Sequence, residues 1–181
     1  MLMYLLYLVN VEGMIAKTRD IRLLLDNIRS VHNVGSIFRT AETIGISHIY
    51  CAGTTPTPND RFGVKRKDFA KVALGSEDII PWEHVDDHVA VIKSLKKLGG
   101  TNKKFGLKII SLEQAENSVD YKSVNINNKG VTLIIIGNEV EGVSKDLLTL
   151  SDVIAEIPMK GLKESLNVSV ATGIFLYRLL D

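Results

Sequence analysis

The sequence is poor in several residue types and patterns, and each shortage excludes a class of protein. A single cysteine, Cys51, allows neither an internal disulfide framework nor a cysteine-based zinc site. The longest apolar run, Met1 to Val9, is far shorter than the roughly 20 residues that span a bilayer. It also lacks the basic segment and the cleavage site of a signal peptide. We therefore expect a cytoplasmic protein in a reducing setting, with no membrane partner.

An excess of charge of one sign is also lacking, since 22 Lys and Arg stand against 21 Asp and Glu. This balance argues against a protein that coats nucleic acid by bulk electrostatics, although it does not exclude a local basic patch. With 45% hydrophobic and 24% charged residues, the composition is that of a globular chain and not of a disordered one.

The length of 181 residues predicts a single domain over residues 1–181. Residues 1–13 are a possible N-terminal extension. The run from Met1 to Val9 reads either as an edge strand or oligomer contact, or as an extension before a second start at Met14, and the sequence favours neither reading decisively.

The balanced total hides a segregation of charge along the chain. The stretch from Thr54 to Lys71 has loop composition, with two prolines, a glycine and five basic residues against two acidic ones. Lys93 to Lys108 carries six lysines and no acid, whereas Glu139 to Glu156 carries five acids against one lysine. Such runs either coat a solvated face or form a basic patch for RNA, and we hold both interpretations open for the lysine run.

Short apolar segments alternate with segments of helical spacing along the chain. The predicted strands are Ile21 to Leu25, His48 to Ala52, Leu107 to Leu112, Val131 to Ile136 and Val153 to Ile157. The predicted helices are Val34 to Ile44, Val85 to Leu98, Ser144 to Leu150 and Val168 to Leu180. Near-continuous apolar strands that alternate with helices indicate an α/β fold with a mostly parallel sheet and helices on both faces.

A first polar cluster, Asn27 to Ala41, follows the first predicted strand and runs into a helix. Carboxyl ends of parallel strands are where open α/β sheets bind ligands, so these polar groups face a candidate site. Asn33 is well placed as the helix cap, a role worth about 1 kcal/mol that needs no function. Arg39 has fewer structural reasons to lie on a largely apolar helix, which makes it the stronger functional candidate.

A second cluster, Ile134 to Ser144, is a strand that enters a glycine-rich turn. Gly137 and Gly142 have the spacing of a phosphate-binding loop, but Val143 stands where that loop needs a lysine. The two carboxylates of this turn would repel a phosphate. They favour a ligand with hydroxyls, amines or positive charge.

A third cluster runs from Ile157 to Ala171, where a strand ends at a proline and a loop leads into the last helix. Either Ser165 or Asn167 could cap that helix. The helix is apolar almost all round, which predicts deep packing or a dimer interface.

Two other kinds of site find little support. His84 and His88 could share one helix face, but they do not form the H-E-x-x-H pattern and no further Cys or His cluster lies nearby, so no metal site is predicted. The G-x-S-x-G pattern of serine hydrolases is absent.

Taken together, the motifs NVGSIFRTA, GNEVEG and IPMKGLKESLNVSVATG resemble those of the SpoU (TrmH-like) RNA ribose 2′-O-methyltransferases of the SPOUT superfamily. The resemblance covers roughly Ile21 to Leu180. It implies a C-terminal deep trefoil knot, a rare exception to the rule that chains are not knotted. It also implies S-adenosyl-L-methionine as cofactor, a homodimer, and tRNA or rRNA as substrate. Val140 departs from the family pattern, where many relatives have glycine.

The resemblance assigns roles to individual positions. It places the cofactor against Gly137, Asn138, Gly142, Ile157, Met159, Ser165, Leu166 and Asn167. It implies catalytic roles for Arg39, Asn33 and Glu139, with Arg39 binding the RNA phosphate or helping to deprotonate the 2′-hydroxyl. Because a guanidinium stays protonated, the first role is physically easier. The basic residues Arg29, Arg61, Lys65, Arg66 and Lys67 are the expected RNA contacts. A catalytically silent RNA-binding dimer that keeps the fold is the alternative.

Overall fold

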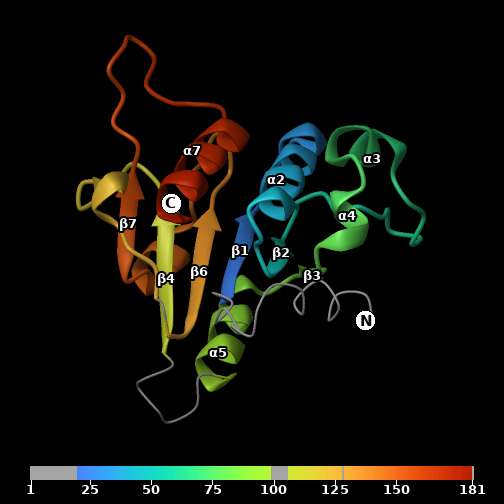
Figure 1. Cartoon of the computed structure of the whole chain (residues 1–181), viewed down its shortest axis with the longest axis horizontal. Coiled ribbons are helices and arrows are strands. Elements are labelled where there is room, and N and C mark those ends of the chain that lie inside the picture. Colours follow the sequence, from blue (N-terminus) through green and yellow to red (C-terminus); the bar gives the residue numbers. More distant parts are fainter. Residues whose placement is uncertain (1–19, 99–105, 128, 181) are drawn as a thin grey trace, which may run out of the picture.

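A seven-stranded sheet forms the centre of the computed structural model, which describes residues 20–98, 106–127 and 129–180 (Figure 1). The strands are β1 (Asp20–Asp26), β2 (His48–Ala52), β3 (Trp82–Val85), β4 (Leu107–Leu112), β5 (Val119–Asp120), β6 (Val131–Ile136) and β7 (Val153–Glu156). Their order across the sheet is β3-β2-β1-β6-β4-β7-β5, and all neighbouring strands are parallel. The predicted α/β class and the mostly parallel sheet are confirmed.

Helices cover both faces of this sheet. They are α2 (Val31–Thr43), α3 (Lys67–Ala73), α4 (Ser76–Ile79), α5 (His88–Leu98), α6 (Lys145–Leu150) and α7 (Val168–Leu180), with a 3-10 turn η2 at Tyr121–Ser123. One face carries α2 and α7, which pack against each other, and the opposite face carries α5 and α6 (Figure 1).

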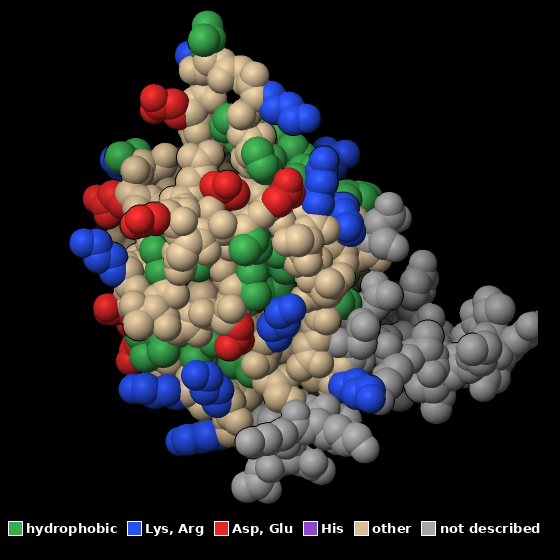
Figure 2. Space-filling view, turned by 90° about the vertical axis from the view of Figure 1, so that its left-hand side faces the viewer, with side chains coloured by type: hydrophobic (Ala, Val, Ile, Leu, Met, Phe, Trp, Pro, Cys, Tyr) green, Lys and Arg blue, Asp and Glu red, His purple; other side chains and the backbone are tan. Residues whose placement is uncertain are grey.

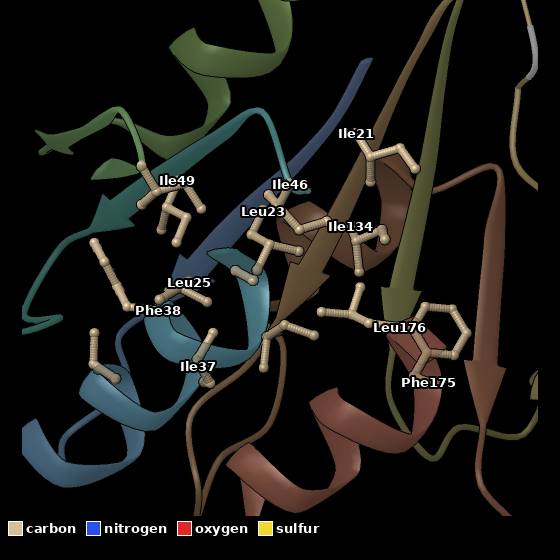
Figure 3. Close-up of a cluster of buried hydrophobic side chains, with 14 of the residues drawn as sticks. Ile21, Leu23, Leu25, Ile37, Phe38, Ile46, Ile49, Ile134, Phe175 and Leu176 are labelled. Atoms are coloured by element: carbon tan, nitrogen blue, oxygen red, sulfur yellow. The ribbon is translucent and has the colours of Figure 1, made fainter. Parts of the chain in front are cut away.

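The central strands are apolar throughout because both of their faces are buried. Leu23 and Leu25 of β1 point into the core under α2 and α7, whereas Leu24 points into the core under α5 and α6. Figure 3 shows how Phe38 of α2 and Phe175 of α7 lie over the first of these faces. Cys51 is buried in the same core, and burial raises the pKa of its thiol to about 12. It is therefore a neutral packing residue.

Ser30, not Asn33, is the N-cap of α2. Its side chain accepts a hydrogen bond from the backbone N–H of Asn33 at 3.3 Å, so the helix begins three residues earlier than predicted. The predicted cap position was wrong because several polar residues in succession could each have served, and the backbone decides between them. The shift frees the Asn33 side chain for contacts elsewhere.

Two other predictions need correction. The segment from Thr54 to Lys71 is not all loop, because α3 begins at Lys67. The helix predicted from Val85 to Leu98 is present from His88 onward, whereas Val85 ends a strand, β3, that was not predicted. Both errors arise where elements of seven residues or fewer carry too few positions for a pattern to emerge. The run from Met1 to Val9 and part of the lysine run lie outside the described residues.

The strand order creates a crevice at the carboxyl edge of the sheet. Strands β1 and β6 are neighbours, but the chain leaving β1 enters α2 on one face, whereas the chain leaving β6 enters α6 on the other. Ligands of open α/β sheets bind at such a switch point. No described helix is long and apolar enough to cross a membrane.

Candidate functional site

A cavity of about 550 Å³ lies at the carboxyl edge of the sheet, within the range of small-molecule sites. Its walls come from the ends of β4, β6 and β7 and from the connection between β7 and α7. All eight residues predicted to hold a cofactor line it: Gly137, Asn138, Gly142, Ile157, Met159, Ser165, Leu166 and Asn167. The structure thus brings together two loops that the sequence separates by some fifteen residues, and their roles remain predictions.

Carboxylates dominate the charge of this cavity. Glu113, Glu139, Glu156 and Glu164 line it, and no Lys or Arg is among the described residues that do so. Figure 2 shows several acidic side chains across the upper part of one face of the molecule, with basic ones at the upper right and both kinds toward the lower end. Such a cavity disfavours phosphate groups and favours a cationic ligand.

Gly137 and Gly142 are glycines for different steric reasons. A Cβ atom on Gly137 would overlap the backbone of Gly142 and Val143, which cannot move aside without opening the turn. Gly142 has a φ of +72°, and a Cβ there would also overlap the carboxylate of Glu113. The turn after β6 therefore depends on close backbone approach at one glycine and on a left-handed conformation at the other.

Side chains of Asn138 and Glu113 hold this turn in place. Backbone N–H and C=O groups of Asn138 and Gly142 exchange two hydrogen bonds of 3.0 Å. The Asn138 amide donates to the backbone carbonyl of Asn27 at 2.7 Å, which joins the turn to the end of β1. Glu113 accepts from the Val143 N–H at 2.7 Å. Each bond satisfies a backbone group that the sheet leaves without a partner.

A chain of polar contacts joins the three motifs. Asn33 donates its side-chain N–H to the Glu139 carboxylate at 2.8 Å and accepts from the Asn167 amide at 3.1 Å. Asn167 in turn accepts from the backbone N–H of Ser169 at 2.9 Å and caps α7, as was predicted of Ser165 or Asn167. Of the three residues predicted to be catalytic, Asn33 and Glu139 are therefore in direct contact.

Glu139 also accepts from the backbone N–H groups of Arg29 and Ser30, at 2.9 and 3.2 Å, just before α2 begins. Partial burial alone would raise the pKa of Glu139, but these bonds and the one from Asn33 outweigh it and lower the pKa below the ordinary value of 4.5. At neutral pH the residue is a carboxylate held at the positive end of the helix.

Arg39 lies away from this cavity. It is exposed on α2 and lines a second hollow, of about 340 Å³, together with Ser36, Thr40, Thr43, Val72 and Tyr177. The hydroxyl groups beside the guanidinium give this hollow the chemistry of a phosphate site. Within one chain, Arg39 is thus separated from Asn33 and Glu139, and its catalytic role remains a prediction.

The basic residues expected to contact RNA differ in their surroundings. Lys65 pairs with Glu77 at 3.0 Å and Asp78 at 2.5 Å, and Arg66 pairs with Asp68 at 3.0 Å. Arg29, Arg61 and Lys67 are exposed. Two of the five predicted contacts therefore have carboxylate partners within the chain, which reduces the charge that they offer to a phosphate.

Sequence reasoning missed the third strand end of the site. Glu113 and Gln114 follow β4 directly, and the same rule that singled out the ends of the first strand and of β6 applies to them.

The two histidines considered as metal ligands, His84 and His88, do not come together in the structure. His84 Nε2 lies 2.9 Å from the Gly53 carbonyl, and His88 lies 3.5 Å from the buried Asp26. Among the described residues there is no group of three metal-binding side chains.

Comparisons with known proteins match this architecture. A model of the SpoU rRNA methylase family matches residues 20–177. The tRNA (guanosine(18)-2′-O)-methyltransferase of Aquifex aeolicus is 30% identical over 161 residues, which cover 89% of this chain and 69% of that protein. The chain spans about two thirds of the length of such curated relatives.

Two solved structures show the same fold. The TrmH/SpoU tRNA modifying enzyme of A. aeolicus superposes with a TM-score of 0.73 at 29% identity, over 90% of this chain and 75% of that one. An AdoMet-bound rRNA methyltransferase from Sinorhizobium meliloti superposes with a TM-score of 0.74, also at 29% identity, over 88% of this chain and 55% of that one.

The packing around Gly137 leads to a first prediction. Gly137→Ala should lower the free energy of unfolding by about 1 to 3 kcal/mol, because its Cβ meets backbone and not a movable side chain. Gly161→Ala is the matched control, since nothing lies within 4 Å of a Cβ there. Urea denaturation of both variants measures the difference, and equal stabilities would contradict the steric argument.

The carboxylate of Glu139 leads to a second prediction. Its pKa is lower in the folded chain than in the unfolded one, so its stabilisation is present above about pH 4.5 and disappears as the pH falls through the folded value. Glu139→Gln should therefore be less stable than the natural chain by about 1 kcal/mol at pH 7. The difference should shrink below pH 4. Denaturant titrations at both pH values test this, and a difference that grows toward low pH would refute it.

Proposed function

The chain belongs to the SpoU rRNA methylase family, and on that premise we propose that it transfers a methyl group from S-adenosyl-L-methionine to a ribose 2′-hydroxyl of tRNA or rRNA. The observation that carries the proposal is the contact of Asn33, Glu139 and Asn167 at the rim of the acidic cavity. Three motifs that are far apart in sequence converge there on one site.

The cavity fits the proposed cofactor in size and charge. S-adenosyl-L-methionine carries a sulfonium and an ammonium group, and four glutamates line a cavity that has no described basic side chain. The close backbone approach at Gly137 leaves main-chain groups at the cavity wall, which are suited to an adenine edge and a ribose. The S. meliloti neighbour is named as AdoMet-bound, which supports the same ligand here.

The reaction would depend mainly on orientation. S-adenosyl-L-methionine, when bound, supplies the electrophilic methyl group. Asn33 and Glu139 would position the acceptor ribose, and Asn167 holds Asn33 in turn. Arg39 would bind the adjacent RNA phosphate from the hollow that it lines, and this contact would hold the acceptor ribose in place for transfer. Ser165 and Leu166 would shape the cavity.

The tRNA and rRNA methyltransferases among the relatives support an RNA substrate. These relatives are named as methyltransferases and therefore do not favour the alternative of a catalytically silent RNA-binding dimer. We also propose that residues 1–181 act as one methyltransferase domain in the cytoplasm.

We further propose the trefoil knot that the resemblance implies. In its support, the part of the chain that follows β7 contacts the segment that leads from β4 to β6 at two places. Gln114 donates to the backbone carbonyl of Glu164 at 3.0 Å, and Arg178 of α7 donates to that of Lys122 at 2.7 Å. Threading of the last helix through this segment needs contacts of that kind.

A homodimer is the final part of the proposal, and α7 supports it. Its inner face is buried against α2, but Val170, Ile174 and Tyr177 remain 49%, 38% and 55% exposed. An apolar row on a helix is suited to an isologous contact with a second copy. Tyr177 also lines the hollow of Arg39, so the partner would lie beside that residue.

Loss of the Arg39 guanidinium tests the assignment of catalysis. Arg39→Ala should bind S-adenosyl-L-methionine as the natural chain does, because Arg39 lies outside the acidic cavity, but should transfer methyl groups at least about 100-fold more slowly. Arg39→Lys should recover part of the rate, and Lys145→Ala controls for removal of a charge on the opposite face. Calorimetry measures cofactor binding, and transfer of labelled methyl groups to total RNA measures the rate. Unimpaired turnover of Arg39→Ala would contradict the catalytic role of Arg39.

A charge placed on α7 tests the dimer. Ile174→Glu should convert the dimer to a monomer, since a stable interface buries about 800 Å² per partner and does not tolerate an unpaired charge at its centre. Val119→Glu, at an equally exposed apolar position on the edge strand β5, should leave the dimer intact. Sedimentation equilibrium reads out both, and a monomeric natural chain would refute the proposal.

A further inference from the structure

A short hairpin at residues 59–65, between β2 and α3, presents an aromatic side chain to solvent. Asn59 and Lys65 pair across it, and the carboxylate of Asp60 accepts from the backbone N–H groups of Phe62 and Val64, at 2.8 and 2.9 Å. Gly63 supports the turn with a φ of +79°. These bonds satisfy the backbone of the hairpin from within, so its tip has a defined shape.

The hairpin is also held at its base. Lys65 pairs with Glu77, whose side chain is 2% exposed, and with Asp78 of α4. The segment that leads from β2 to the hairpin is anchored as well. There the Thr55 hydroxyl accepts a hydrogen bond of 3.1 Å from the Ile28 N–H, just after β1. The hairpin therefore rises from the same edge of the sheet as the acidic cavity, and it extends outward beside α3 and α4 (Figure 1).

Phe62 lies at the tip and is 75% exposed. Burial of a phenylalanine ring stabilises a folded chain, so an exposed ring leaves apolar surface available to a partner. The guanidinium of Arg61 lies over the ring at 4.7 Å from its centroid. Arg61 forms no ion pair with a carboxylate among the described residues, unlike its neighbours Lys65 and Arg66.

We propose that Phe62 and Arg61 form a stacking site for an unpaired nucleobase of the RNA substrate, an inference that rests on the proposed function. The ring of Phe62 offers an apolar face to the base, and Arg61 offers a planar cation that stacks or reaches the adjacent phosphate. The defined shape of the hairpin reduces the conformational entropy lost on binding.

An unpaired base fits this surface better than a duplex or a second copy of the chain. A base within a duplex has both faces stacked and cannot reach a ring at a hairpin tip. A second copy would bring the same uncompensated guanidinium against itself, whereas RNA brings phosphates. The site would thus select RNA whose loop or end lies close to the nucleotide to be modified.

Binding of a labelled 12-nucleotide single-stranded RNA of mixed sequence tests the site, with the matching 12-base-pair duplex as a second probe. Phe62→Ala should bind the single strand about ten-fold or more weakly and the duplex as the natural chain does. Val64→Ala is the matched control, because it removes an equally prominent apolar side chain, 61% exposed, from the same hairpin without removing a π-face. Phe62→Trp should keep the affinity, and its added fluorescence should be quenched on binding.

Several outcomes would overturn the site: equal affinity of Phe62→Ala and the natural chain for the single strand, an equal loss in Val64→Ala, or a change of sedimentation in place of a change in RNA affinity. Methyl transfer to total RNA is measured in parallel. If the natural chain transfers no methyl group and Phe62→Ala still weakens single-strand binding, the proposed function fails and the stacking site stands. If transfer is intact and the Phe62→Ala affinity is unchanged, the stacking site alone fails.

Discussion

The carboxylate of Glu139 connects two segments that lie more than a hundred residues apart in the chain. Its oxygens accept from the backbone before α2 and from the side chain of Asn33, while its own backbone belongs to the turn after β6. The Asn138 and Ser144 bonds tie the turn to the end of β1, and the Glu139 contact adds the start of α2 to this connection. The position of Asn33, and through it of Asn167, depends on the same carboxylate.

The need to satisfy backbone N–H groups explains why the site is rich in hydrogen-bond acceptors. At the carboxyl edge of a parallel sheet, turns and helix starts present N–H groups that no strand or helix satisfies. Asp26, Glu113 and Glu139 each accept such a group, from Ser144, Val143 and Arg29. Two of these carboxylates, Glu113 and Glu139, also line the cavity and supply half of its four glutamates. For these two residues, the bond to the backbone and the preference for a cationic ligand have one physical origin.

Much of this could be predicted from the sequence, and the exceptions have physical reasons. Strands such as Val131–Ile136 are apolar on both faces and stand out in any pattern, and glycines at 137 and 142 mark a tight turn. The short elements α4, β3 and β5 have too few residues for a period. The cap of α2 depends on backbone angles. Asn33 and Arg39 lie six residues apart on one helix and therefore on different faces of it, a separation that follows from helix geometry but not from motif membership. Pairing of Lys65 with Glu77 joins a hairpin to helix α4, and no local pattern predicts that contact.

The near-neutral chain faces an electrostatic problem if its substrate is RNA. A cavity lined by four glutamates repels the phosphates that must come close to it, and two of the five candidate cations are already paired. Charge alone therefore gives little net attraction between the site and RNA. Additional positive charge near the cavity would attract RNA but would weaken the preference for a cationic cofactor. Stacking on an exposed ring escapes this conflict, because it depends on apolar contact and not on net charge. An aromatic side chain at a hairpin tip, which does not line the acidic cavity, is a physically consistent way for such a protein to hold RNA.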